Sequence, residues 1–297
     1  MTSDLAPDLA PDLVPELRRD LLDRIERYYD AVPRSSARAE DFGTLTLFVR
    51  EGAGWPYYAR PALGSAAGAT ADDVERVRAR QRELGVPEAL EWVDETTPGL
   101  RAAVEATGLA VHAHPLMALD LDADAPAGPA EPPRADGAVV RMLAADDPAL
   151  LGAMCVPQLA FADRGTAVGA AGAVELAERM REQAGAGTVG RIARRIEEGL
   201  TRQAAALEDD TVLCAGQHQP VGEVSEIVGV GTLPAARRRG LGAAVTAALV
   251  ADARARGVRT VFLSAGDEHV ARIYARVGFR RVGTALIAEP AEDTAGQ

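Results

Sequence analysis

Apolar positions follow two different periods along this chain, and segments with the two periods alternate. Leu17, Leu21, Ile25 and Tyr28 are spaced by four, four and three residues, which predicts an amphipathic helix after Pro15. Residues 43–50 alternate and are rich in β-formers, which predicts a strand. The same reasoning predicts helices at 71–84, 98–107, 173–182, 191–207, 240–256 and 268–277, another opening at 146–151, and strands at 89–93, 116–121, 139–143, 210–215, 223–232 and 258–264. The pattern indicates an α/β (α+β) protein.

Two proline-rich stretches divide the chain. In residues 4–15 a proline recurs every fourth position, which prevents a continuous helix and indicates a flexible leader over 1–15. Residues 122–138 contain four prolines in a polar, acidic context and predict an extended linker. We therefore expect one domain at 16–121, a second at 139–290 and a tail at 291–297.

Composition excludes several classes of protein. A hydrophobic fraction of 47% and a charged fraction of 26% are those of an ordinary globular chain. The formal charge of −12 disfavours nucleic acid and anionic membranes as partners. Cys155 and Cys214 form no CxxC pair, so neither a disulfide framework nor a metal site is expected. With no signal peptide and no long apolar run, we expect a cytoplasmic location.

The stretch from 222 to 279 carries the clearest chemistry. A predicted strand ends at Pro234, a basic turn follows, and an apolar helix begins after Gly240. Unpaired N–H groups and the dipole at such a helix start attract anions, and Gly240 and Gly242 let a phosphate approach the backbone. A Rossmann fingerprint starting at Gly229 would need glycine at 234, and a Walker A loop would need a lysine, which the chain lacks.

Two motifs in this stretch resemble the GCN5-related N-acetyltransferase (GNAT) superfamily. They are Arg237-Arg238-Arg239-Gly240-Leu241-Gly242 and, further on, Tyr274 four residues before Gly278-Phe279. In that family the loop holds the pyrophosphate of acetyl-CoA, and the tyrosine lies beside the thioester sulfur. The resemblance implies two tandem GNAT-like domains, each a mixed, mostly antiparallel sheet flanked by helices, in an arrangement similar to that of mycothiol synthase.

The resemblance also implies roles for individual residues. The backbone of Val230, Gly231 and Thr232 would bind the pantetheine arm. The pyrophosphate would lie on a loop made of Arg237, Arg238, Arg239, Gly240, Leu241, Gly242 and Ala243. Asp267 stands where the family has an asparagine that contacts the pantetheine, and an ionised aspartate cannot donate that hydrogen bond. Arg276 would reach the 3′-phosphate.

Acyl transfer to an amine requires a base for the amine and an acid for the leaving thiolate. The resemblance makes Tyr274 the general acid. Glu226 is the candidate base, because it lies four residues before Val230 and would share its strand face. Burial there would raise its pKa. Alternatives for the base are Glu223, His269 and His218, the last of which we expect at a hairpin tip; Ser264 could orient the substrate.

The first half resembles a diverged copy of the second. Residues 89–121 and 259–288 both read strand, helix, glycine and strand, with Gly108 aligned to Gly278. Val104 then stands opposite Tyr274 and cannot transfer a proton. The first half also lacks the Arg-x-x-Gly-x-Gly loop, so we expect it to bind no CoA and to wall the substrate cleft or stabilise the second half.

These features predict an acetyl-CoA-dependent N-acetyltransferase that acts on a small primary amine. The alternatives are a longer acyl-CoA as donor, a protein N-terminus as acceptor, or a CoA-binding or sensing module without turnover. No metal, nucleic acid or membrane is expected as a partner, and the oligomeric state stays open.

Overall fold

The computed structural model describes residues 13–65, 68–122, 135, 137–163, 165–185 and 187–291. The predicted leader lies outside the described residues up to residue 12. Most of the predicted linker and nearly all of the tail also lie outside them.

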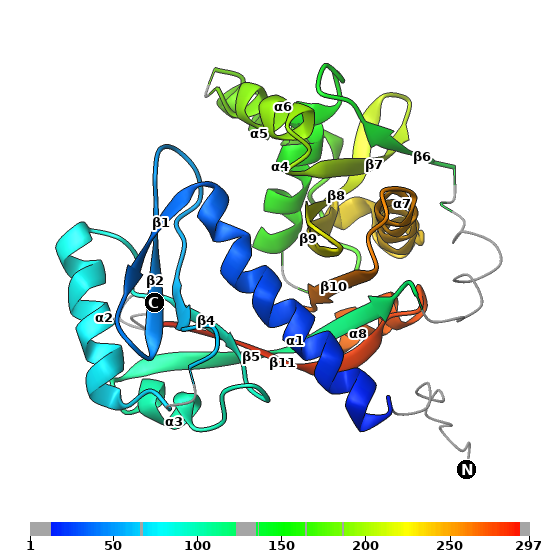
Figure 1. The fold of residues 1–297 in the computed structure, drawn as a ribbon. Helices are drawn as coiled ribbons and strands as arrows, with labels where there is room; N and C mark the ends of the chain where they lie inside the picture. Colours follow the sequence, from blue (N-terminus) through cyan, green and yellow to red (C-terminus); the bar gives the residue numbers. More distant parts are fainter. Residues whose placement is uncertain are drawn as a thin grey trace, which may run out of the picture.

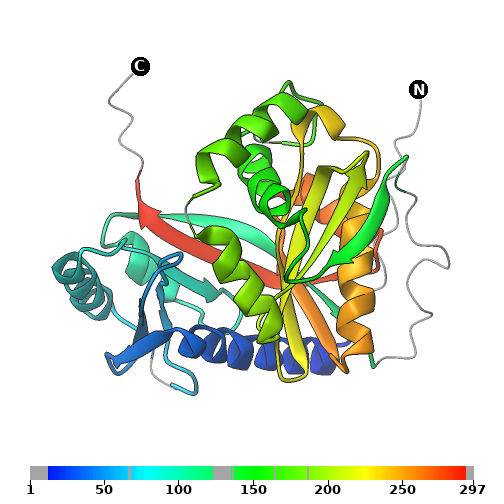
Figure 2. The same ribbon diagram turned by 90° about the horizontal axis from the view of Figure 1, so that it is seen from above.

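Eleven strands form a single sheet in the order β1-β2-β3-β4-β11-β5-β10-β9-β8-β7-β6 (Figures 1 and 2). The strands are β1 (Ala37–Asp41), β2 (Leu45–Arg50), β3 (Ala59–Pro61), β4 (Leu90–Val93), β5 (Leu109–Asp120), β6 (Val139–Leu143), β7 (Arg202–Glu208), β8 (Thr211–Val221), β9 (Val224–Thr232), β10 (Thr260–Ser264) and β11 (Arg280–Pro290). The helices are α1 (Pro15–Ala31), α2 (Ala71–Leu84), α3 (Leu100–Glu105), α4 (Leu150–Ala162), α5 (Ala173–Gln183), α6 (Thr188–Glu197), α7 (Leu241–Ala255) and α8 (Glu268–Ala275). The mixed, largely antiparallel sheet confirms the predicted fold class.

The two halves repeat one topology and exchange their last strands. In the first half β3, α2 and β4 form a parallel unit, and in the second β9, α7 and β10 do the same. The strand after each unit then crosses over: β5 pairs with β10 of the second half, and β11 pairs with β4 of the first. β5 and β11 pair with each other in the middle of the sheet. The tandem arrangement is thereby confirmed, while the domain boundaries at 121 and 139 stay a prediction.

Helix α1 spans both halves on one face of the sheet (Figures 1 and 2). Its buried residues pack with Phe262 of β10, and the rings of Tyr28 and Tyr29 meet that of Phe262 edge-on at 5.0 and 5.2 Å. The neighbours of Phe262 along β10, Val261 and Leu263, point the other way into the core that contains α7. The sheet therefore presents an α1 face and an opposite α7 face.

The predicted helix at 191–207 is wrong in its second part. α6 ends at Glu197, and residues 202–208 form β7. Ala204, Ala205 and Ala206 favour a helix intrinsically but are fully buried between β6 and β8. Pairing within the sheet overrides the local preference there. β5 is also longer than the predicted 116–121 segment, and β1 and β3 were not predicted.

The strand exchange predicts that the two halves unfold together. Leu116 is fully buried in β5, between β10 and β11, so Leu116→Ala should cost about 2–5 kcal/mol of unfolding free energy. In urea, Trp92 fluorescence reports the first half and the reactivity of the buried Cys155 and Cys214 thiols reports the second. Both midpoints should coincide and shift together.

The control for this experiment is Leu63→Ala, at a side chain that is 50% exposed. It should change the free energy of unfolding by less than about 0.5 kcal/mol. Separate midpoints for the two reporters would contradict the coupling.

Candidate active site

The sheet opens between β9 and β10. These parallel strands pair from Val224 with Thr260 to Glu226 with Phe262, and the pairing stops there. Residues 227–232 of β9 continue along β8 but form no pairs with β10. The backbone of β9 on that edge is thus available to an extended ligand, and Glu226 lies at the point where the opening begins.

A bulge in β9 changes which side chains share a face. Gly229 has a φ of +66°, and the register with β8 shifts between Ala215 and Gln217. Val230 consequently points to the α7 face, because a Cβ on Gly216 would meet both Val230 and Leu249. Glu226 faces α1 instead. The expectation that Glu226 and Val230 share a face is therefore wrong, since the extra residue inverts the alternation.

Gly231 and Thr232 of β9 lie close to the helices on the two faces of the sheet. A Cβ on Gly231 would lie 2.7 Å from the Cα of Pro157, so glycine is what allows α4 to approach β9. Thr232 lies on the α7 side, where its hydroxyl is near Gly242 and hydrogen-bonds the Cys214 thiol. This places the strand of the opening directly beside the start of α7.

The glycine loop meets the requirements of an anion site. Gly240 precedes α7 with a φ of +75° and supplies no side-chain cap. Among the described residues, no backbone carbonyl accepts from the N–H of Gly240, Leu241 or Gly242. A Cβ on Gly242 would meet only the Thr232 hydroxyl at 3.8 Å, so the space in front of these groups is open. Unused donors at the positive end of a helix favour a phosphate.

Arg237 has a structural role in this loop. Its guanidinium donates to the backbone oxygens of Ala160, Asp163 and Ala167 and to the Asp163 carboxylate, over 2.5–3.1 Å. The side chain is 8% exposed. It holds the loop against the C-terminal end of α4 and does not point to solvent, so the prediction that it binds pyrophosphate finds no support in this geometry.

The other two arginines of the loop are more accessible. Arg238 is exposed and has a φ of +68°, a conformation rarely adopted by residues with a side chain. Arg239 is 29% exposed and forms an ion pair with Glu208 at 2.6 Å. Both lie beside the loop whose N–H groups face outward, as a pyrophosphate site requires.

Tyr274 is buried on the α7 side, where its ring meets that of Phe279 at 6.1 Å. Burial raises the pKa of its hydroxyl, and the nearby Cys214 sulfur adds to the effect. The hydroxyl is therefore protonated at neutral pH and can donate. Tyr274 and Glu226 lie on opposite faces of the sheet, with the β9–β10 opening between them.

Glu226 has the pKa expected of a base for an amine. Burial, with the charge of Glu91 as the second cause, raises its pKa to about 8, against an ordinary value of 4.5. The Tyr29 hydroxyl donates to its carboxylate at 3.3 Å and opposes this rise. A carboxylate with a pKa near the working pH is an effective proton acceptor.

The sequence did not single out three of the residues around Glu226. Tyr29 comes from α1, Arg60 from β3 and Glu91 from β4, and all three lie on the α1 face near the opening. The sequence offered one signal for Glu91. It is a carboxylate within the apolar strand segment 89–93, where its neighbours in β4 are buried.

His218 is not at a hairpin tip, contrary to the prediction. It lies inside β8, fully buried, with Nδ1 2.8 Å from the Ser225 hydroxyl and Nε2 3.0 Å from the Asp252 carboxylate. The turn falls instead at Gly222 and Glu223. Although the order Ser225, His218, Asp252 suggests a triad, Ser225 is also fully buried, so no substrate reaches it.

The remaining alternatives for the base have other partners. His269 contacts Arg272, and Glu223 pairs with Arg259 at 3.4 Å; both are exposed. Ser264 contacts Tyr29 near Glu226, which keeps it as a candidate for orienting substrate. Asp267 accepts from the Val270 N–H at 2.8 Å and caps α8.

Arg276 is exposed at the end of α8, and its contact with a 3′-phosphate stays a prediction.

The corresponding helix start in the first half is closed. Thr70 caps α2 by accepting from the Asp73 N–H, while Asp73 accepts from the Thr70 N–H at 2.7 Å. Asp72 and Asp73 add negative charge to the first turn. Two N–H groups at the start of α2, those of Thr70 and Asp73, are thus occupied by this capping pair, and the carboxylates of the first turn repel a phosphate.

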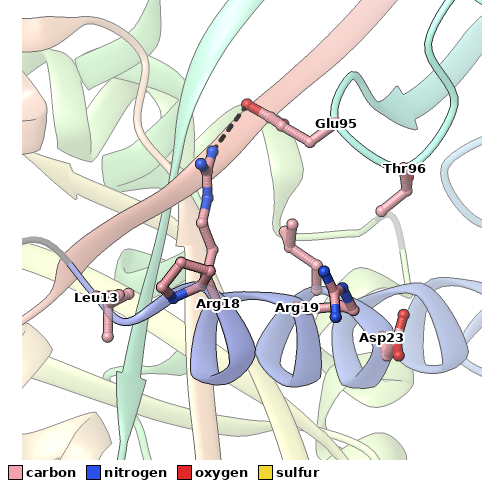
Figure 3. Close-up of a pocket in the computed structure, with 8 residues that line it drawn as sticks. Leu13, Arg18, Arg19, Asp23, Glu95 and Thr96 are labelled. Atoms are coloured by element: carbon pink, nitrogen blue, oxygen red, sulfur yellow. Dashed lines mark hydrogen bonds and ion pairs between the residues drawn. The ribbon is translucent and has the colours of Figure 1, made fainter.

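A groove of about 430 Å³ lies elsewhere, at the N-terminal end of α1 (Figure 3). Arg18 is paired there with Glu95 at 3.4 Å and donates to the Val282 carbonyl at 2.6 Å. None of the predicted site residues lines this groove. It lies along the first half of α1, whereas Tyr29 lies in the last turn of that helix.

Comparison with known proteins agrees with this geometry. The acetyltransferase (GNAT) family profile matches residues 144–279. A GCN5-related N-acetyltransferase from Kribbella flavida is 21% identical, with a TM-score of 0.62, over 93% of this chain and 98% of its own. One from Sphaerobacter thermophilus is 18% identical, with a TM-score of 0.51, over 86% and 84%. A functionally unknown conserved protein from Staphylococcus epidermidis is 12% identical, with a TM-score of 0.52, over 88% and 96%. No curated protein matches.

The fold, the opening beside a glycine loop and the family profile define an acyltransferase. Residues 144–279, within the second half of the chain, match the acetyltransferase (GNAT) family. The structural likenesses are all below 25% identity and establish the shared fold. None of the described helices combines the length and hydrophobicity that a membrane span requires.

The raised pKa of Glu226 predicts a pH-dependent stability change. Between pH 4.5 and about 8 the unfolded chain has released a proton that the folded chain retains, so the free energy of unfolding falls as pH rises through this window. Glu226→Gln removes this loss. Its urea midpoint relative to wild type should therefore be higher at pH 8.5 than at pH 5.

The matched control for this comparison is Glu51→Gln, at an exposed glutamate directly after β2. Its midpoint difference from wild type should be the same at both pH values. An equal difference for Glu226→Gln at pH 5 and 8.5 would contradict the buried, raised-pKa carboxyl.

Proposed function

We propose that the chain transfers an acetyl group from acetyl-CoA to the nitrogen of a primary amine. The observation that carries this proposal is that β9 loses its pairing with β10 at Glu226 and runs from there to the open N-terminus of α7. An extended ligand with a pyrophosphate at one end would place its other end at Glu226. Acetyl-CoA supplies the acetyl group as an activated thioester.

The phosphate end would be held by the backbone N–H groups of Gly240, Leu241 and Gly242, with Arg238 and Arg239 adding positive charge. The unpaired edge of residues 227–232 would hydrogen-bond the pantetheine arm. One of its N–H groups would also stabilise the oxyanion that forms at the thioester carbonyl. The residues present fit the ligand, because Gly242 leaves open space at the start of α7 and no side chain caps the helix.

Glu226 accepts a proton from the ammonium form of the substrate, and the neutral nitrogen attacks the carbonyl carbon. The carbon–nitrogen bond forms, the carbon–sulfur bond breaks, and Tyr274 donates a proton to the departing sulfur. The second proton lost by the nitrogen restores Tyr274. The overall change converts R–NH₃⁺ and the thioester into the amide, the thiol and one released proton.

The first half is proposed to bind no CoA. Its equivalent helix start, that of α2, is occupied by the capping pair of Thr70 and Asp73. Val104, aligned with Tyr274, is fully buried in the core of that half. One site per chain follows from this contrast.

Calorimetric titration of acetyl-CoA into the full-length chain tests the phosphate site. We expect one site per chain and at least about 100-fold weaker binding in Gly242→Asp, whose carboxylate would lie among the donors of α7. Gly190→Asp is the matched control, since Gly190 lies near the start of α6, is exposed and has open space around it. Two sites, or equal binding by both variants, would contradict the proposal.

Acid–base roles predict separate kinetic effects. In a thiol-release assay across a panel of primary amines, Glu226→Gln should lower kcat by about 10²–10⁴. Wild-type kcat/KM should rise with pH up to about 8, because the base must be ionised, and this rise should vanish in Glu226→Gln. Tyr274→Phe should lower kcat while retaining acetyl-CoA binding. Acetyl-CoA binding without turnover of any amine would favour a CoA-binding module instead.

A further inference from the structure

The first half contributes a carboxylate to the face on which Glu226 lies. In β4 the flanking residues Leu90 and Trp92 are buried in the core beneath α2 and α3. Strand alternation turns Glu91 and Val93 the opposite way, and Val93 packs with α1. Glu91 therefore lies on the α1 face, as Glu226 does, although the two residues belong to different halves of the sheet.

The charges on this face are not balanced. Arg60 is 1% exposed, forms an ion pair with Glu26 and lies 5.0 Å from the centre of the Tyr29 ring. Both partners of its guanidinium, Glu26 and Tyr29, belong to α1. In the described part of the chain, no hydrogen bond or ion pair is formed by the Glu91 side chain, whereas its backbone pairs with β11. When they are ionised, Glu26, Glu91 and Glu226 together exceed the single positive charge of Arg60.

Two tyrosines of the first half, Tyr29 and Tyr58, lie near both carboxylates. Tyr29 donates to Glu226, and burial raises the pKa of its hydroxyl, with smaller contributions from the charges of Glu226 and Glu91. Burial also raises the pKa of Tyr58, which directly precedes β3, and the charges of Glu91 and Glu226 add to this rise. Burial alone raises the pKa of Glu91, to about 7, with Arg60 opposing it. Two partly desolvated carboxylates among aromatic rings favour a bound cation.

We propose that Glu91 is a specificity-determining residue, which binds the ammonium group of a cationic alkylamine beside Glu226. This inference rests on the proposed function and names its acceptor class. An ammonium group has three donors and can bridge two carboxylates, so one can accept its proton while the other keeps the nitrogen in place. The first half then selects the substrate that the second half acetylates.

Titration of 1,4-diaminobutane into the full-length chain, without acetyl-CoA, tests this directly. Its uncharged counterpart, 1,4-butanediol, has the same length. Wild type should bind the diamine and not the diol, and Glu91→Gln should weaken diamine binding at least about tenfold. Glu91→Asp should restore part of it. Glu289→Gln, an exposed glutamate on β11, should bind as wild type does.

Acetyl-CoA binding and the thermal midpoint show whether Glu91→Gln is folded, and both should be retained. With an acceptor that is turned over, Glu91→Gln should raise the KM for the amine about tenfold with little change in kcat, whereas Glu226→Gln should lower kcat. A purely structural Glu91 would not separate the two constants in this way.

Equal diamine binding by wild type and Glu91→Gln, or equal binding of diamine and diol by wild type, would overturn the inference. Absence of diamine binding to wild type would overturn it as well. A chain that binds the diamine through Glu91 but binds no acetyl-CoA would overturn the proposed function and leave this inference standing.

Discussion

The pairing of β5 with β11 is the interaction on which the rest of the structure depends. Each strand leaves its own half and completes the sheet of the other, so the two halves share one hydrogen-bonded unit. This pairing fixes β10 beside β5 and thereby fixes the opening between β9 and β10. It also brings β4 close enough for the charge of Glu91 to act on Glu226. Residues of both halves therefore surround the candidate site, although the two motifs that mark it in the sequence both lie in the second half.

The two helix starts show how a repeated topology can acquire different chemistry. Both α2 and α7 connect parallel strands, and both begin at the same place in their unit. A threonine and two aspartates close one, and glycines leave the other open. The difference involves a few side chains and no change in the fold, which is consistent with binding at one helix and a supporting role for the other.

How much could be predicted depended on the range of the interactions involved. α2, β6 and the glycine loop follow from nearby residues, and the sequence predicted them closely. The positions of Arg60 and Glu91 depend on which strands become neighbours, and a pairing between residues 93 and 285 leaves no local pattern. The bulge at Gly229, which turns Val230 to the face opposite Glu226, could not be predicted from the sequence. Glycine occurs in strands with and without a bulge, so its presence alone does not indicate one. The alanines of β7 were read as helix because their burial comes from distant strands.

The strand exchange also bears on how the chain is synthesised and folds. The first half emerges from the ribosome with β4 paired to β3 but lacking its other neighbour, β11, which is made nearly two hundred residues later. Its long strand β5 is likewise exposed until β10 follows it. Contacts of such large sequence separation slow folding and leave strand edges open to wrong partners. The sheet is therefore completed only when β11, at residues 280–290, has been made and pairs with β4 and β5.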